Sequence, residues 1–122
     1  DHRDLHSFPT RRSSDLPRKD DRCYILSEFG GYAIKTEGHM YSPDNQFGYR
    51  IYKKPAALAK AIKRLYEKTI VPKIDKGLSA TVYTEVSDVE QEMNGLVTFD
   101  RRVIKVPIDL MREINAQLVI KD

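Results

Sequence analysis

Glu28 is the residue of this sequence best placed to do chemistry. It ends a short apolar run, residues 23–27, and Phe29, Gly30 and Gly31 follow it directly. An apolar run of this length is typical of a buried parallel strand, and two glycines let the backbone turn sharply and leave space beside the carboxylate. The pattern therefore predicts a strand that delivers an acid into a site. It also fits a solvated glutamate in a loop.

A second group of carboxylates lies at residues 85–92, where Glu85, Asp88, Glu90 and Glu92 follow one another closely. This grouping suggests a metal-binding loop, but it lacks the oxygen-ligand spacing and the placed glycine of a calcium loop. We therefore predict no metal site and no cofactor. The acids are interpreted as structural or substrate-facing loop residues.

Other polar features are interpreted locally. Asn94-Gly95 is a turn signal, and Asp100 is expected to form ion pairs with the two arginines that follow it. His39 is interpreted as an ordinary loop residue, with a bond to a substrate hydroxyl as the alternative. The single cysteine, Cys23, is interpreted as a small core residue, and it excludes an internal disulfide framework.

The elements that must position these residues alternate between strand and helix. Residues 23–28 are expected to form a strand, residues 30–54 a long loop, and residues 78–84 a second strand. A helix should begin at Pro55 and be kinked or ended by Pro72. Its predicted apolar stripe is Leu58, Ala61, Ile62, Leu65, Thr69 and Ile70. Strand, helix and strand form a βαβ unit, which implies parallel pairing.

A last helix is expected from Pro107. Its predicted apolar face consists of Ile108, Met111, Ile114 and Leu118, which recur at helical spacing. Proline at the start of a helix is favourable because its missing N–H would be unsatisfied there in any case.

Composition indicates a globular chain. Charged residues make up 32% of the sequence and hydrophobic residues 40%, and the formal net charge is +3. No apolar run approaches the roughly 20 residues that cross a bilayer, so no membrane partner is expected. The positive charge is weak and dispersed, so no nucleic-acid partner is expected either.

We interpret the first residues of the chain as foreign to the protein. Residues 6–16 read HSFPTRRSSDL, which resembles one translated reading frame of a sequencing adapter. A basic arm that binds nucleic acid, or a phosphorylation segment, is the biological alternative. We exclude residues 1–16 from fold reasoning as non-native, and we treat residues 17–21 as an uncertain junction.

Two segments resemble one enzyme family. The string ILSEFGGY at 25–32 resembles the nucleophile segment of glycoside hydrolase family 2, the retaining exo-β-glycosidases that include β-galactosidases, β-glucuronidases and β-mannosidases. The string GLSATVYTEVSDVEQEMNGLVTFDRRVIK at 77–105 resembles the last barrel strand and following loop of the β-galactosidase-like branch. The strings occur in the family's order, joined by a helix-length connection.

This resemblance implies an α/β fold. Residues 22–122 would be the C-terminal fragment of a (β/α)8 TIM barrel, about its last two βα units. A whole barrel takes roughly 250 residues, so the first six strands are expected to be missing from this chain.

The resemblance also implies a mechanism and a site. Retaining glycosidases use two carboxyl groups about 5–5.5 Å apart, a nucleophile and an acid/base. Glu28 matches the family's nucleophile, whereas the acid/base glutamate lies upstream on strand four. We therefore expect a retaining exo-β-glycosidase acting by double displacement, of which this chain alone is inactive. Tyr83 and Thr84 match positions from which the family lines its sugar pocket.

Three alternatives stay open at this stage. Glu85 is expected to line the pocket or to pair with an arginine, and geometry does not forbid it from acting as the acid. Tyr32 is expected to pack against a sugar ring, as the loop residues Tyr41 and Tyr49 could, although loop aromatics often serve packing alone. The whole protein could also be a non-catalytic carbohydrate-binding or scaffolding homologue of the same barrel.

The expected substrate is a carbohydrate with a neutral terminal sugar. No arginine or lysine occurs between residues 23 and 34 to clamp a carboxylate, and Lys35 lies just beyond. A β-galactoside is therefore favoured over a glucuronide.

Overall fold

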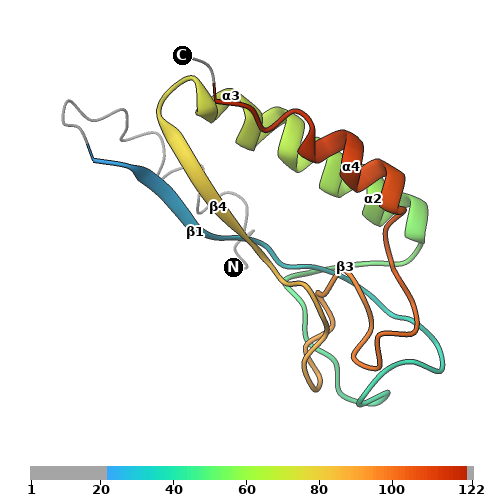
Figure 1. Cartoon of the computed structure of the whole chain (residues 1–122). Helices are drawn as coiled ribbons and strands as arrows, with labels where there is room; N and C mark the ends of the chain where they lie inside the picture. Colours follow the sequence, from blue (N-terminus) through green and yellow to red (C-terminus); the bar gives the residue numbers. More distant parts are fainter. Residues whose placement is uncertain (1–21, 121–122) are drawn as a thin grey trace.

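The computed structural model describes residues 22–120 (Figure 1). Its elements in chain order are β1 (Tyr24–Gly30), β2 (Tyr32–Ile34), β3 (Arg50–Tyr52), α2 (Pro55–Leu65), a π-helical segment (Tyr66–Ile70), α3 (Val71–Ile74), β4 (Leu78–Thr84) and α4 (Ile108–Asn115). The chain is therefore an α/β protein with small parallel sheets. The adapter-like segment 1–16 and the junction 17–21 lie outside the described residues.

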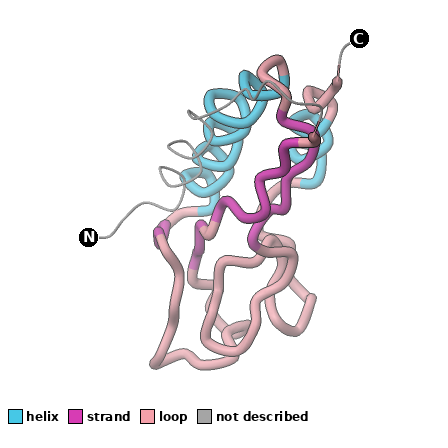
Figure 2. Tube along the Cα trace, turned by 90° about the vertical axis from the view of Figure 1, so that its left-hand side faces the viewer, coloured by secondary structure: helices cyan, strands magenta, loops and turns pink. Residues whose placement is uncertain are grey.

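The central unit is the parallel pair of β1 and β4, which α2 and α3 connect in sequence. Its register joins Tyr24 to Leu78 and Gly30 to Thr84. In Figure 1 the helices lie along one face of this pair, and in Figure 2 the long loops gather beyond one end of the strands. The predicted βαβ unit is confirmed, and β4 has the predicted bounds.

Each strand of this pair carries one extra residue. Between the pairs Tyr24–Leu78 and Ile25–Ala80, β4 advances by two residues while β1 advances by one. Between Leu26–Thr81 and Phe29–Tyr83, the extra residue lies in β1. Such bulges turn a side chain to the other face of a sheet. Alternation along β1 is therefore broken at residues 27–28, where both side chains are exposed.

The core lies between the sheet and the helices. Leu58, Ile62 and Leu65 of α2 are buried against it, as is Ile70 of the π-helical segment. The predicted apolar stripe is thus confirmed at these positions. Phe29 enters the same cluster from β1, and burying side chains of this size contributes about 1.5–3 kcal/mol each.

The predicted loop over residues 30–54 is wrong in part, because it contains two strands. β2 and β3 pair in parallel, with Tyr32 opposite Arg50 and Ile34 opposite Tyr52. The predicted strand 23–28 is also displaced, since β1 ends at Gly30. Gly30 and Gly31 have φ angles of 102° and 80°, which separate β1 from β2. Strands of three residues are too short for sequence periodicity to reveal them.

Pro72 affects the helix without breaking it. The chain passes from α2 through the π-helical segment into α3, where Pro72 lies in the first turn. The N–H of Val71 donates to the carbonyl of Tyr66, five residues earlier. Because proline offers no N–H, the widened turn lets the helix continue past it. The helical segment ends at Ile74, and Gly77, with φ 105°, precedes β4.

The last helix, α4, begins directly after Pro107, as predicted. Ile114 is buried and Met111 is half-buried against the core. Ile108 was expected on the same face, but it is 49% exposed. The helix ends at Asn115, so Leu118 packs from the segment beyond it.

Within the described part of the chain, no element covers the face of the sheet opposite the helices. Ile25 of β1 and Val82 of β4 are each 55% exposed there. Within residues 22–120, β1 pairs only with β4, so each strand also has a free edge. No described helix is long and apolar enough to cross a membrane.

The open face should drive self-association of the chain. Replacing two residues, I25T/V82T, is expected to weaken association at least tenfold, because each apolar side chain contributes about 1.5–3 kcal/mol when removed from water. Sedimentation velocity measures the effect. The control is I108T, which removes an exposed isoleucine from α4. Equal association of the two variants would contradict an adhesive sheet face.

Candidate functional site

Glu28 lies at the carboxyl end of β1 and is exposed. The extra residue in β1 brings it to the outside, because Phe29 next to it is fully buried against the helices. No side-chain hydrogen bond or ion pair involves Glu28 within residues 22–120. The carboxylate is thus accessible at a strand end, where it can act as a nucleophile or bind a hydroxyl group.

The backbone beside Glu28 is closely packed. A Cβ atom on Gly30 would lie 2.7 Å from the ring of Tyr83 and 3.0 Å from the carbonyl oxygen of Thr84. The N–H of Gly31 donates to that same carbonyl over 2.8 Å. A side chain at position 30 would therefore separate the ends of β1 and β4. The two glycines serve close strand contact as well as the turn predicted for them.

Thr84 is the predicted pocket residue that lies nearest the end of β1. It pairs with Gly30 and is half-buried. Thr84 and Glu28 therefore end neighbouring parallel strands at the same edge of the sheet.

Tyr83 and Tyr32 are not placed on the open face with Glu28. The ring of Tyr83 packs edge-on against Phe29 at 5.3 Å between centroids and stacks with Tyr66 at 6.2 Å. Burial raises the pKa of Tyr83 and raises that of Tyr66 to about 12. Tyr32 is buried and packs edge-on against Tyr52 at 5.5 Å. Both predicted sugar-binding rings thus serve the core between sheet and helices.

Glu85 belongs to a group of carboxyls on the loop after β4. Burial raises its pKa to about 7, and the negative charges of Glu92 and Asp88 add to this rise, while Lys105 opposes it. The Glu85 carboxyl therefore holds its proton to a higher pH than an ordinary glutamate does.

A buried ion pair organises this loop. The Lys105 ammonium donates to Asp88 Oδ1 over 2.6 Å and to the Met93 carbonyl over 2.9 Å. Asp88 Oδ1 also accepts the N–H of Gly95 over 2.8 Å. A Cβ atom on Gly95 would lie 2.3 Å from the backbone nitrogen of Asp88. Burial lowers the pKa of Lys105, and its bond to Asp88 opposes this. The loop closes only around a glycine at position 95.

Asn94 is a polar residue whose position the sequence analysis missed. Its side chain is fully buried, and neither amide atom has a hydrogen-bond partner in the described part of the chain. Glu85 Oε2 and the Tyr83 hydroxyl are also buried atoms without a hydrogen-bond partner in the described part of the chain. Unpaired buried amides are rare because each one costs about 1–3 kcal/mol. The Asn94-Gly95 signal predicted only a turn and gave no indication of burial.

Asp100 and His39 pair with each other, and the predicted ion pairs of Asp100 with Arg101 and Arg102 are wrong. Asp100 accepts the Thr98 hydroxyl over 2.7 Å, and its other oxygen bonds His39 Nδ1 over 2.8 Å. These contacts, led by Thr98, lower the pKa of Asp100. The local bond that does form comes from the backbone N–H of Arg102, over 3.1 Å. Sequence spacing favoured the adjacent arginines, whereas the long-range contact depends on how the loops fold.

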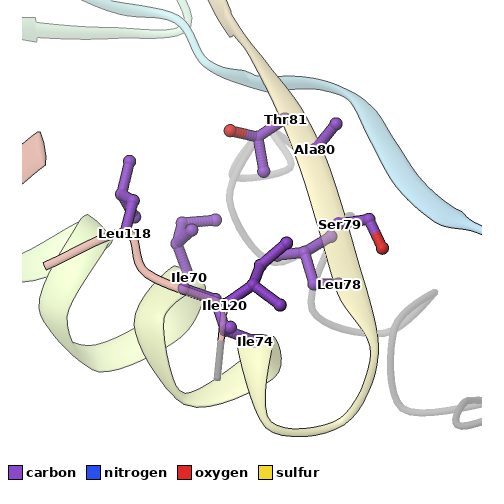
Figure 3. Close-up of a pocket in the computed structure, with 8 residues that line it drawn as sticks. All are labelled: Ile70, Ile74, Leu78, Ser79, Ala80, Thr81, Leu118 and Ile120. Carbon is purple, nitrogen blue, oxygen red and sulfur yellow. The ribbon is translucent and has the colours of Figure 1, made fainter. Parts of the chain in front are cut away.

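An apolar cavity lies away from Glu28. It has a volume of about 180 Å³ and opens near the start of β4, at the opposite end of that strand from Thr84. Figure 3 shows its lining residues, Ile70, Ile74, Leu78, Ser79, Ala80, Thr81, Leu118 and Ile120. None of the predicted site residues lines it. Among residues 22–120, no group of three metal-ligating side chains converges.

The buried Asp88–Lys105 pair should dominate the stability of this loop. K105M is expected to cost roughly 3–5 kcal/mol, because it leaves a buried carboxylate without its cation. Urea unfolding measures the loss. The control is D88N/K105M, which keeps an oxygen acceptor for Gly95 and removes both charges. It should recover a large part of the stability, and no recovery would contradict the ionic origin of the loss.

The Glu85 carboxyl should make stability fall as pH rises. Its pKa in the folded chain is about 7 against an ordinary 4.5, so between these values the folded state retains a proton that the unfolded state has released. The stabilisation that this carboxyl contributes is therefore complete below its pKa in the unfolded chain. It is lost as the pH rises through its pKa in the folded chain. E85Q should exceed the unmodified chain in melting temperature by a margin that grows from about pH 5 to about pH 8. A margin that does not change with pH would contradict this.

The chain was also compared with known proteins. No protein-family model matches it, and no curated protein matches it.

Proposed function

We propose that this chain is the C-terminal part of a retaining exo-β-glycosidase barrel, with Glu28 as the nucleophile. The proposed reaction is hydrolysis of a terminal β-linked sugar by double displacement. Glu28 attacks the anomeric carbon, the aglycone leaves, and water then releases the sugar from the enzyme.

The observation that carries the proposal is the exposure of Glu28 near the carboxyl end of β1. A carboxylate at the carboxyl end of a parallel strand is turned out by an extra residue while its neighbour Phe29 stays buried. Bulges occur preferentially beside active sites, where they redirect a side chain. In TIM barrels the catalytic residues lie at the carboxyl ends of the strands. An exposed glutamate held in this way fits the role of a nucleophile.

The uncovered sheet supports the barrel. Barrel strands are covered by helices outside and by other strands' side chains inside. Here one face of the β1–β4 pair carries the helices, while Ile25 and Val82 project from the other. Both strands also keep a free edge within the described residues. Further strands of a barrel would cover this face and pair with these edges.

The resemblance of segments 25–32 and 77–105 implies that the second carboxyl group of the mechanism lies on an upstream strand. The charged groups that act on Glu85 are Glu92, Asp88 and Lys105. Buried Asp88 is engaged by Lys105. We therefore propose that the acid/base residue comes from an upstream strand and that this chain alone does not hydrolyse glycosides. The absence of a cation between residues 23 and 34 supports a neutral sugar, with a β-galactoside favoured.

The test is to obtain the gene sequence continuous with codon 17 from the same source and to express the complete protein. We expect hydrolysis of an aryl β-galactoside with retention at the anomeric carbon. E28Q should reduce turnover by several orders of magnitude and leave the melting temperature within a few degrees. E37Q, which changes an exposed glutamate in the loop after β2, is the matched control. Unchanged turnover in E28Q would end the assignment of the nucleophile.

A further inference from the structure

The exposed aromatic side chains of the described chain are confined to two loops. They are Tyr41, Phe47, Tyr49 and Phe99. All four lie in the segments that follow β2 and β4, whereas the aromatic residues of the strands and helices are buried or half-buried. Two of these four rings contact each other across the two loops, and two contact each other within one loop.

Tyr41 and Phe99 form a pair between these loops. Their ring centroids are 5.7 Å apart, and the ring planes are nearly perpendicular at 89°. Tyr41 is 59% exposed and Phe99 37% exposed. In an edge-to-face pair one ring presents its edge to its partner, so ring faces remain available to a ligand.

A polar contact holds this pair in place. His39, two residues before Tyr41, bonds Asp100, which is adjacent to Phe99. Asp100 is fixed in turn by the Thr98 hydroxyl and the backbone N–H of Arg102. The two loops are therefore joined at neighbouring positions by one polar and one aromatic contact. Rigid, exposed rings lose little conformational entropy when they bind a ligand.

We propose that Tyr41 and Phe99 form a stacking site for a pyranose ring of an oligosaccharide. The C–H face of a sugar ring is apolar and its rim carries hydroxyls, which suits a ring face bordered by the phenolic hydroxyl of Tyr41. The site lies on the loops beyond the carboxyl ends of β1 and β4, at the end of the sheet where Glu28 is exposed. The site would bind sugar units of the substrate other than the terminal sugar that is cleaved off. This assignment rests on the proposed function.

The experiment compares long and short substrates in the complete protein. Y41A and F99A are each expected to raise KM for β-1,4-galactotetraose about tenfold, the scale of one lost aromatic contact. kcat should be unchanged, and KM for an aryl β-galactoside should also be unchanged because that substrate lacks the outer sugars. Y41F should raise this KM less than Y41A does, since it keeps the ring and loses only the phenolic hydroxyl. I108T is the matched control for loss of an exposed apolar side chain.

Binding measured without turnover separates this proposal from the proposed function. Saturation-transfer NMR with the E28Q protein should show contact to the ring protons of the inner sugars of galactotetraose, and Y41A/E28Q should lose the contact to those inner sugars. If the complete protein hydrolyses no glycoside but this contact is present, the glycosidase fails and the stacking site stands. If Y41A and F99A lower only the melting temperature and leave both KM values unchanged, the rings pack against another part of the protein and the proposal is overturned.

Discussion

The edge-to-face contacts of Phe29 with Tyr66 and Tyr83, each at 5.3 Å, are the interactions on which the rest of the structure depends. They attach β1 to the helical layer and to β4 at the same point. Because Phe29 must face inward, the residue before it can leave the core only where the strand carries an extra residue. The position of the Glu28 carboxylate is therefore set by the packing of its neighbour, and the core and the candidate site cannot vary independently.

The loop after β4 is organised differently, by buried charge. Lys105 pairs with Asp88, and burial, reinforced by the charges of Glu92 and Asp88, raises the pKa of Glu85 to about 7. Asn94 lies in the same loop with an unpaired amide. The Lys105 ammonium joins Asp88 to the Met93 carbonyl, so removing either charged partner would leave the other buried and unpaired.

Much of the framework could be predicted from sequence. Pro55, the stripe Leu58–Ile62–Leu65 and the run 78–84 specify a helix and a strand through local preferences, which need no knowledge of the rest of the chain. The short strands β2 and β3 could not be predicted, since each depends on the other for its hydrogen bonds. The inward rings of Tyr32 and Tyr83 and the pairing of His39 with Asp100 were missed for a related reason. A residue type indicates what a side chain can do, whereas the fold decides which face it occupies.

The two extra residues of the β1–β4 pair also limit which insertions and deletions these strands can accept during evolution. The separation in sequence between paired residues is the same at Tyr24–Leu78 as at Gly30–Thr84, and it is one residue larger at Ile25–Ala80 and Leu26–Thr81. The irregularity in one strand therefore cancels that in the other. A single-residue deletion in either strand would shift every later pairing, while matched deletions in both would restore the register. Relatives of this chain should gain or lose these two residues together, as a linked pair of insertions or deletions.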